Sequence, residues 1–245
     1  MISLNDPGAV EGDIDDDERD GLELRSFGRK RGRKLSTRQE RLIAQVLPKL
    51  AVDLSKPAGA VAEFRPQPYA DVWLEIGFGG GEHLLWQATH NAAVLLIGCE
   101  PFVDGMAKAL DGVETGGLGN VRLHADDARP LLRWLPPGSL GRCFILFPDP
   151  WPKRRHVKRR LVSPSTLALV ARALRPGGEL RIATDIGDYA RTAMLAVAAT
   201  PQLRWTATRA ADWRERPADW PQTRYEAKAI REGRPRYFLR FLRLP

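Results

Sequence analysis

The chain has 245 residues, and about half of them are apolar when glycine is counted and tyrosine is not, which is usual for globular proteins and excludes a wholly disordered chain. The formal net charge is +8, but the first twenty residues carry −7, so the rest of the chain carries +15. This surplus favours a polyanionic partner such as nucleic acid, although a solvated basic surface would have the same composition.

The cysteines and the longest apolar run exclude further classes of protein. Cys99 and Cys143 lie far apart within apolar stretches, and the chain has only four histidines, so neither a disulfide framework nor a zinc site is indicated. Residues 92–97, the longest clean apolar run, are far fewer than the roughly eighteen that span a bilayer. The acidic amino terminus is the opposite of a signal peptide. We therefore expect a soluble, reduced, cytoplasmic protein with no membrane contact and no metal.

The sequence divides into three parts. Residues 1–24 are acidic and poor in bulky apolar groups, which predicts a disordered leader. Residues 25–60 begin with a basic cluster, Arg25 to Arg41, and continue into an amphipathic helix that starts at Ser36 or Thr37 and that Pro48 is expected to shorten. A connector rich in proline, alanine and glycine follows over 57–68, and residues 61–245 are expected to form the main domain.

From residue 71 onward, short β-rich runs alternate with helical patterns, which predicts βαβ units around a parallel sheet. The expected strands are 72–76, 94–100, 121–124, 143–147 and 179–183. The expected helices are 82–89, 103–110, 128–134, 164–174 and 189–199. Pro176-Gly177-Gly178 is expected to end the fourth of these helices. Near the carboxyl terminus, strands are expected over 204–208 and 237–242, with a short helix over 223–231 between them.

The first strand ends in Glu75-Ile76-Gly77-Phe78-Gly79-Gly80-Gly81, directly before a helix. Glycines such as Gly77 and Gly79 let the backbone approach a ligand in the crevice where parallel strands end, although a flexible turn is the alternative. The third glycine comes one residue early for the pattern that binds a dinucleotide. The carboxylate of Glu75 suits a cationic ligand instead, and S-adenosylmethionine has an ammonium and a sulfonium but no phosphate.

Two further acids follow the next two strands. Glu100 ends the second strand, at the position where an acidic side chain binds the two hydroxyls of a ribose. Asp127 lies just past the third strand, where it is placed to bind the amino group of an adenine. Each acid alone would more often be a helix cap or lie in solvent. Acids at three strand ends together favour a site for the methyl donor S-adenosylmethionine.

The fourth strand runs into Pro148-Asp149-Pro150-Trp151-Pro152, and six of the next eight residues, 153–160, are basic. An aspartate fixed at a strand end, beside an aromatic ring, is suited to receive an extruded base while the cations hold phosphates. The alternative is a proline-rich turn with a solvated basic face and with Trp151 in the core. Asp185, which follows the fifth strand, is expected in the same crevice unless it only caps the next helix.

These motifs resemble those of the bacterial tRNA (guanine-N7-)-methyltransferases. The residues that carry the resemblance are Arg25-Ser26-Phe27, Leu74 to Gly79, Gly98-Cys99-Glu100, Phe147 to Trp151 with Lys153 and Arg155-His156, Ala183-Thr184-Asp185, and Thr223-Arg224-Tyr225-Glu226. The proline-aspartate-proline-tryptophan block is the most specific of them. Two features depart from the family pattern: Tyr225 stands where phenylalanine is common, and the acidic leader has no counterpart.

The resemblance implies a fold, a cofactor and a partner. The fold would be α/β, a Rossmann-like S-adenosylmethionine-dependent methyltransferase over residues 61–245, with a seven-stranded, mostly parallel sheet and helices on both faces. The activity would be transfer of a methyl group from S-adenosylmethionine to N7 of the variable-loop guanine, position 46, of tRNA. The chain would act as a monomer or homodimer.

The resemblance also assigns roles to residues. Those expected to bind the cofactor are Glu75, Glu100, Asp127 and Asp149, joined by Gly77 and Gly79 of the glycine-rich turn, and Asp149 is also the catalytic candidate. Those expected to bind the substrate are Lys153, Arg155, His156, Lys158, Arg159, Arg160, Asp185, Thr223, Arg224, Tyr225 and Glu226. Together with the Arg25 to Arg41 cluster, the cations of 153–160 are expected to give salt-dependent RNA affinity.

Guanine N7 has an in-plane lone pair, so its methylation needs no strong base. The enzyme is expected to align the reactants and to stabilise the base cation with carboxylates, while Asp149 and Asp185 accept hydrogen bonds from the guanine ring NH and amine. Three other hypotheses stay open. The chain could methylate another RNA base or a small molecule, it could be a non-catalytic RNA-binding module that kept the same body, or, least favoured, it could be a nicotinamide oxidoreductase.

Overall fold

The computed structural model describes residue 32 and residues 34–56 and 69–245. The acidic leader expected over 1–24, most of the basic run that follows it and the connector over 57–68 lie outside these residues.

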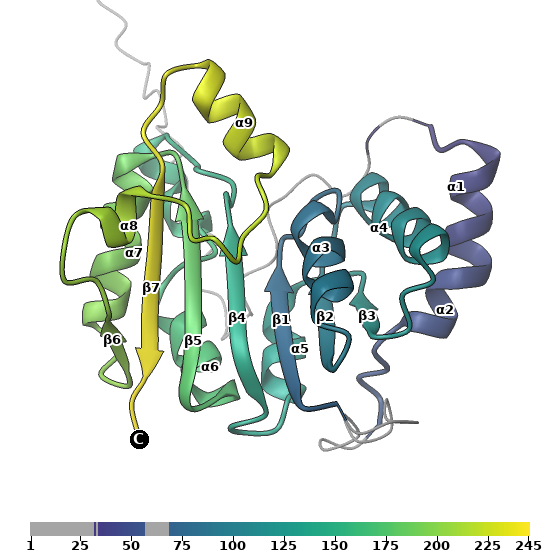
Figure 1. The fold of residues 1–245 in the computed structure, drawn as a ribbon, viewed down its shortest axis with the longest axis horizontal. Coiled ribbons are helices and arrows are strands. Elements are labelled where there is room, and N and C mark those ends of the chain that lie inside the picture. The colour runs from purple at the N-terminus through teal and green to yellow at the C-terminus, as the bar shows by residue number, and fades with distance from the viewer. Residues whose placement is uncertain (1–31, 33, 57–68) are drawn as a thin grey trace, which may run out of the picture.

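Seven strands form a single sheet in the order β3-β2-β1-β4-β5-β7-β6 (Figure 1). The strands are β1 Asp71–Ile76, β2 Val94–Cys99, β3 Val121–His124, β4 Leu140–Leu146, β5 Leu174–Thr184, β6 Leu203–Trp205 and β7 Tyr237–Arg243. Strands β1 to β5 pair in parallel, and β7 runs antiparallel to β5 and β6. The predicted seven-stranded, mostly parallel sheet is therefore confirmed.

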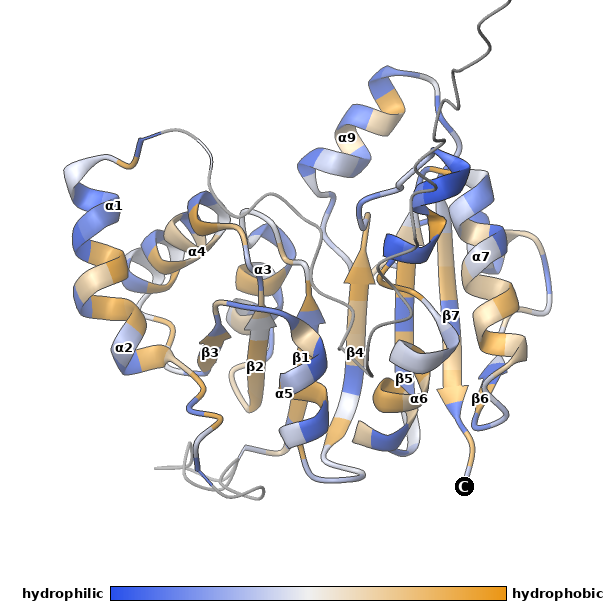
Figure 2. Cartoon of the chain, turned by 180° about the vertical axis from the view of Figure 1, so that it is seen from behind, coloured by the Kyte–Doolittle hydropathy of each residue, from blue (hydrophilic) through white to orange (hydrophobic). Residues whose placement is uncertain are grey.

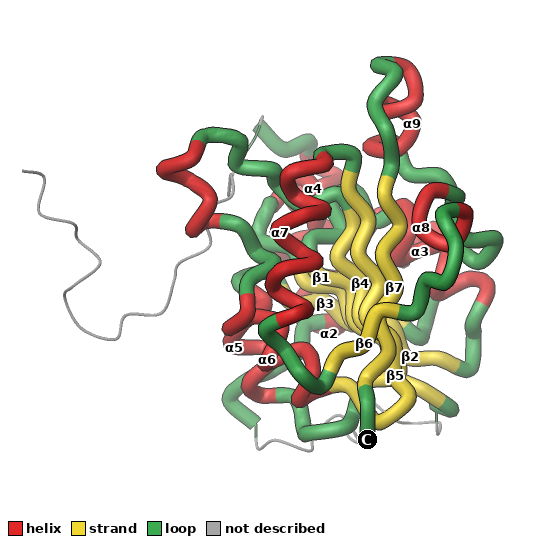
Figure 3. The backbone as a smooth tube through the Cα atoms, turned by 90° about the vertical axis from the view of Figure 1, so that its left-hand side faces the viewer, coloured by secondary structure: helices red, strands yellow, loops and turns green. Residues whose placement is uncertain are grey.

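Helices cover both faces of the sheet, as predicted (Figure 3). The helices α5 Ala128–Trp134, α6 Pro164–Ala173 and α7 Gly187–Ala198 pack on one face, and α3 Glu82–His90 and α4 Val103–Gly116 pack on the other. Successive side chains of β4 alternate between the two cores, with Cys143 on the first face and Phe144 on the second. Because both faces are covered, strand β2 is buried and apolar throughout, and Figure 2 shows orange along much of it.

The amino-terminal helical segment belongs to the second core. It consists of α1 Thr37–Arg41, a π-helical turn over Leu42–Val46 and α2 Leu47–Leu50, and it begins at the Ser36 cap. The helix passes Pro48 instead of ending before it, because the wider π turn accommodates the absent N–H of the proline. Leu42 is completely buried. Beyond the helix, the Val52 N–H donates to the Leu123 carbonyl of β3 at 2.9 Å.

Helix α4 extends six residues further than expected, to Gly116, where Gly117 caps it with φ of 60°. Gly112 lies within this extension. In the fold it allows close packing, since a Cβ at this position would lie 2.3 Å from a methyl of Leu85 on α3. A glycine inside a helix that packs closely on its neighbour does not end that helix.

The carboxyl-terminal part differs from the prediction in detail. Strand β5 begins at Leu174 and includes the Pro176-Gly177-Gly178 stretch, so the preceding helix ends at Ala173. Strand β6 covers only Leu203–Trp205, and a short helix that was not predicted, α8 Ala211–Arg214, follows it. The predicted helix over 223–231 is present as α9 Arg224–Arg231. It projects beyond the end of the sheet (Figures 1 and 3).

Candidate active site

A cavity of about 440 Å³, the main cavity below, lies where the parallel strands end. The segments that line it follow β1, β2, β3 and β4 in turn, and α9 contributes Tyr225. The lining residues include Gly77, Gly79, Glu100, Asp127, Asp149, Trp151, Lys158, Arg159, Arg160 and Tyr225. Residues from several expected strand ends thus meet in one cavity.

The glycine-rich turn forms one wall of this cavity. Gly77 and Gly79 adopt left-handed backbone conformations, with φ of 75° and 58°. A side chain at either position would strain the turn. A Cβ at Gly79 would also lie 3.3 Å from the ring of Tyr225. The glycines therefore allow the turn to fold tightly beneath α9.

Glu100 is held by two backbone N–H groups, one in the turn after β1 and one after β2. Its two carboxylate oxygens accept hydrogen bonds from the N–H of Gly79 at 2.8 Å and from the N–H of Phe102 at 2.9 Å. Burial raises the pKa of Glu100, and these two donors reduce the shift. The charge of Asp149 across the cavity raises the same pKa further. The side chain is therefore preorganised without a cationic partner among these contacts.

Asp127 is the cap of α5 and borders the cavity as well. It accepts a hydrogen bond from the Arg129 N–H at 2.8 Å and forms an ion pair with the Arg129 guanidinium at 2.6 Å. Burial alone would raise the pKa of Asp127, but the contacts with Arg129 outweigh it and the pKa lies below the usual value. The capping role considered for this residue and its place in the cavity wall are both realised.

Asp149 lies in a stretch of strained backbone. Phe147 and Trp151, the residues on either side of the Pro-Asp-Pro block, have φ of 49° and 41°, and each precedes a proline. Residues other than glycine rarely adopt such angles, and each instance costs on the order of 1–3 kcal/mol. Strain of this kind persists only where the surroundings enforce it.

Arg160 enforces it. Although it was expected among the RNA-contacting cations, its side chain is only 2% exposed. Its guanidinium donates to the Pro150 carbonyl at 3.0 Å and forms an ion pair with Asp188 of α7 at 2.6 Å. The Phe147 N–H donates to the Ala183 carbonyl of β5 at 2.7 Å. Arg160 therefore fastens the strained stretch to α7.

The other cations of this segment lie nearer the surface. Residues Arg154–Arg159 form a short 3₁₀ helix, with Lys153 and Arg155 exposed and Lys158 and Arg159 on the cavity wall. The Arg159 guanidinium lies 5.2 Å from the centre of the Trp151 ring, and His156 meets the edge of the same ring. Burial and the neighbouring cations lower the pKa of His156, so this ring holds a proton less readily than a free imidazole.

The stretch Thr223 to Glu226 has four different environments. Thr223 caps α9, and Arg224 pairs with Glu82 of α3 at 3.3 Å. Tyr225 is 45% exposed at the cavity mouth. Glu226 is buried and lies 3.2 Å from the Arg216 guanidinium, and burial raises its pKa. Of the four, Tyr225 alone lines the main cavity, and the others fix α9 against the body.

Asp185 and Glu75 also lie outside the lining of the main cavity. Asp185 forms an ion pair with Arg234 at 2.7 Å, so its carboxylate is already partnered. Glu75 is buried and accepts a hydrogen bond from Nδ1 of His83 at 2.8 Å. It borders a small hollow that shares Gly77, Phe147 and Tyr225 with the main cavity. His83 was not singled out in the sequence, where its only signal is its place in the first turn of the helix after the glycines.

The described cations of the amino-terminal cluster are largely paired with acids. Arg38 contacts Asp111 at 2.5 Å and Arg41 contacts Glu114 at 2.5 Å, and both acids lie on α4. These two arginines attach the amino-terminal helix to the body. This differs from the expectation that the whole Arg25 to Arg41 cluster supplies RNA affinity.

Within the part of the chain that the structure describes, no helix combines the length and the apolar character needed to cross a membrane. Across residue 32 and residues 34–56 and 69–245, no group of three or more histidine, cysteine, aspartate or glutamate side chains is arranged to hold a metal ion.

The strand order defines a Rossmann-like α/β fold, and its acid-lined cavity lies at the carboxyl ends of the parallel strands. Solved structures agree on the fold. The 16S rRNA methyltransferase KamB aligns with a TM-score of 0.54 and 18% identity, over 78% of this chain and 95% of that chain. TrmN from Thermus thermophilus aligns with a TM-score of 0.52 and 19% identity, over 76% of this chain and 48% of that one.

Sequence comparisons narrow the class to one family. A family model described as "Putative methyltransferase" matches residues 69–239. Proteins named tRNA (guanine-N(7)-)-methyltransferase match this chain at 47% identity in Rhodospirillum rubrum, over 91% of this chain and 89% of that protein, and at 48% in Bradyrhizobium diazoefficiens, over 93% and 97%. The chain belongs to the tRNA (guanine-N(7)-)-methyltransferase family. The predicted family, fold class and enzyme class are confirmed.

Proposed function

We propose that the main cavity binds S-adenosylmethionine and that the chain transfers its methyl group to N7 of guanine 46 in the variable loop of tRNA. The observation that carries the proposal is the set of carboxylates around the cavity, Glu100, Asp127 and Asp149, beside a basic surface formed by residues 153–159. A cationic donor and a polyanionic acceptor would thus meet at one edge of the sheet.

The residues present fit this donor. A cavity of about 440 Å³ lies within the range of small-molecule sites, and its acids match a ligand that carries an ammonium, a sulfonium and hydroxyl groups. Glu100 would accept hydrogen bonds from the ribose hydroxyls, since the backbone donors of Gly79 and Phe102 hold its carboxylate in place. Asp127 would receive the adenine amino group. Glu75 would bind the amino-acid end from the adjoining hollow.

The residues on the opposite wall would receive the base. Asp149 lies on the cavity wall between the strained positions 147 and 151, and Tyr225 stands at the mouth. An Asp149 carboxylate can accept hydrogen bonds from the guanine ring NH and amine, which adenine cannot donate in the same pattern. Asp185 could contact the guanine only by leaving Arg234, so we assign guanine recognition to Asp149.

The donor, when bound, supplies an electrophilic methyl group on a positively charged sulfur. The chain's own contribution would be alignment and electrostatics, because guanine N7 presents its lone pair without losing a proton. Asp149 would stabilise the positive charge that the base gains as it is methylated. Arg160 would keep Asp149 in place through its bond to the Pro150 carbonyl.

Exposed cations would bind the RNA backbone. Lys153 and Arg155 are exposed in the segment that continues into the cavity lining, and Lys228 is exposed on α9, whereas Arg224 would contact RNA only by leaving Glu82. Two basic segments thus stand at the mouth of the cavity, where phosphates on either side of an extruded guanine would pass. Phosphate contacts of this kind position RNA without reading its sequence.

The direct test is methyl transfer from labelled S-adenosylmethionine to unmodified tRNA, followed by nucleoside analysis. We expect label in 7-methylguanosine, and no label when guanine 46 is replaced. Label in another nucleoside would contradict the assigned position. Donor binding measured by calorimetry separates the remaining alternative, because a non-catalytic RNA-binding module need not bind S-adenosylmethionine.

A further inference from the structure

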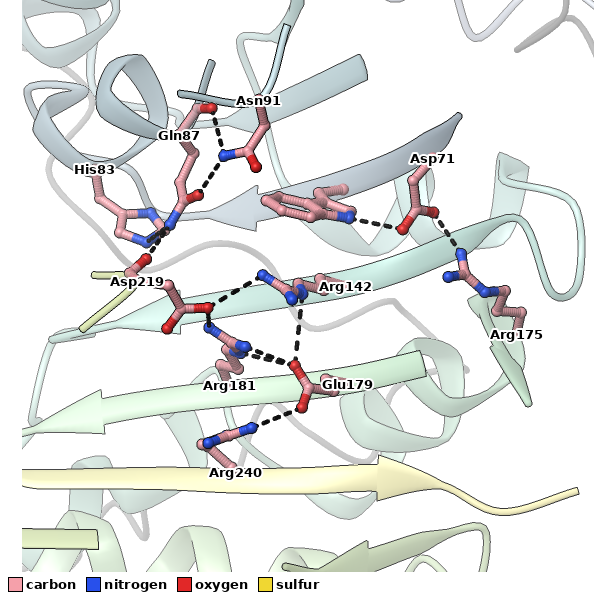
Figure 4. Close-up of polar contacts among 11 residues, drawn as sticks. Asp71, His83, Gln87, Asn91, Arg142, Arg175, Glu179, Arg181, Asp219 and Arg240 are labelled. Carbon is pink, nitrogen blue, oxygen red and sulfur yellow. Dashed lines mark hydrogen bonds and ion pairs between the residues drawn. The ribbon is translucent and has the colours of Figure 1, made fainter. Parts of the chain in front are cut away.

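A series of hydrogen bonds connects Glu75, at the end of β1, to the backbone of Asp219 in the loop before α9. The Glu75 carboxylate lies 2.8 Å from Nδ1 of His83, and Nε2 of His83 lies 3.1 Å from the amide nitrogen of Gln87. The same amide nitrogen donates to the backbone carbonyl of Asp219 at 2.8 Å. Figure 4 shows this contact from α3 to the loop before α9.

The Asp219 carbonyl determines which group donates in each of these three hydrogen bonds. A carbonyl only accepts, so the Gln87 group that faces it is the NH₂. That NH₂ also faces Nε2 of His83, so Nε2 accepts and the ring hydrogen is on Nδ1. His83 then donates to Glu75, whose oxygen accepts.

A second contact fixes the Gln87 amide independently. The side-chain nitrogen of Asn91 donates to the Gln87 side-chain oxygen at 3.0 Å and to the Gln87 backbone carbonyl at 2.9 Å. If the amide were reversed, two donors would face each other at Asn91 and two acceptors at Asp219. The orientation therefore satisfies both ends.

The surroundings of His83 exclude water. The side chain is 2% exposed, and its ring lies 4.7 Å from the Phe144 ring and 6.1 Å from the Trp220 ring, measured between centres. Hydrogen bonds in such surroundings are strong, and a buried acceptor that loses its donor has no solvent to replace it. Glu75 depends on His83 in this way.

We propose that His83 is a positioning residue for donor binding: its Nδ1–H holds the Glu75 carboxylate beside the cavity, and Gln87, anchored on the Asp219 carbonyl, sets the required tautomer. This rests on the proposed function, in which Glu75 binds the amino-acid end of the donor. The loop that contains Asp219 and precedes Thr223 would then help to orient the Glu75 carboxylate through Gln87 and His83.

Two substitutions separate this role from packing. An asparagine in place of His83 keeps an N–H donor near the position of Nδ1, whereas a leucine keeps only bulk. We expect His83→Leu to raise the Kd of S-adenosylmethionine about tenfold or more, and His83→Asn to change it by less than about threefold. His90→Asn, on the exposed end of the same helix, is the matched control and should bind as the wild type does.

Turnover adds a readout that misfolding would not mimic. Because Glu75 would bind the donor in the ground state and in the transition state alike, His83→Leu should raise KM for the donor and leave kcat at saturating donor within about threefold. Equal donor affinity in His83→Leu and the wild type would overturn the proposal, as would His83→Asn binding as weakly as His83→Leu.

A measurement on the unaltered protein tests the tautomer. The ¹⁵N shifts of the His83 ring should show the hydrogen on Nδ1, and Gln87→Leu should introduce the other tautomer. A wild-type ring with its hydrogen on Nε2 would contradict the assigned chain of bonds. Wild-type protein that fails to bind S-adenosylmethionine would instead refute the proposed function, so the two failures are distinguishable.

Discussion

The two walls of the cavity are held in place by different means. On the donor wall, formed by residues 76–81, 100–102 and 126–129, backbone N–H groups hold the acids that line the cavity: Glu100 accepts from two of them, and Asp127 accepts from one as the cap of α5. On the base wall, formed by residues 147–161, two strained residues flank Asp149, and the buried side chain of Arg160 holds the stretch. Single substitutions should therefore change affinity on the donor wall and disrupt geometry on the base wall.

The largest effect is expected at Asp149. Asp149→Ala removes the carboxylate that faces the developing charge, and kcat should fall by about a hundred- to a thousandfold, the usual loss for one electrostatic group in an active site. Binding of tRNA, measured by filter retention, should stay measurable because the surface cations are unchanged. Near-normal turnover would remove Asp149 from catalysis.

Arg160→Leu tests what holds the base wall. The substitution leaves the Pro150 carbonyl without its donor and breaks the pair with Asp188, so the free energy of unfolding should fall by about 1–3 kcal/mol. Urea denaturation measures this change. Arg155→Leu, an exposed neighbour, is the control and should cost less than about 0.5 kcal/mol. Equal stability of the two variants would mean that Arg160 does not support the strained stretch.

Donor affinity should depend on pH through Glu100. Burial raises the pKa of Glu100 above its ordinary value of 4.5, and protonation removes the negative charge and turns one acceptor oxygen into an O–H donor, so hydrogen bonds from ribose hydroxyls weaken. Affinity should therefore be highest above this raised pKa and should fall as the pH is lowered through it, at a higher pH than for an exposed glutamate. Calorimetry across pH should show this loss, about tenfold, and Glu100→Gln should flatten the profile. A parallel profile in the variant would assign the titration to another group.

The smallest effect concerns the surface cations. Replacing Lys153 and Arg155 by glutamine should reduce the slope of log affinity for tRNA against log salt by about one to two, because each phosphate contact contributes slightly less than one. Replacing Arg38 and Arg41 in the same way is the control. Their charges pair with Asp111 and Glu114, so the slope should barely change. Equal slopes for both pairs would return the amino-terminal cations to the RNA-binding surface.

Local patterns predicted the frame of the site well. Apolar runs that lead up to Glu75, Glu100 and Asp149 placed three acids at or near strand ends, because the buried parts of parallel strands are mostly apolar and polar residues become common where they stop. The glycine-rich turn was placed correctly for the same reason. Both the strand ends and the glycine-rich turn depend on residues that are neighbours in the sequence.

Contacts between distant residues could not be predicted in this way. Gln87 meets Asp219 across 132 positions, and Arg38 meets Asp111 across 73. Arg160 looks like its basic neighbours in the sequence, and only its proximity to α7 shows that it is buried. The close approach of Leu85 to Gly112 within α4 is likewise not visible in the sequence.

The bond between Val52 and the outermost strand has a consequence for how copies of this protein meet. An open strand edge offers unpaired N–H and carbonyl groups to any other chain, and it is a common route to aggregation. At one edge of the sheet, residues 51 and 52 already pair with the backbone of β3 at Leu123. At the other edge, β6 has only three residues. Neither edge is a long template for intermolecular pairing, which favours dispersed molecules even when they are crowded along a polyanion.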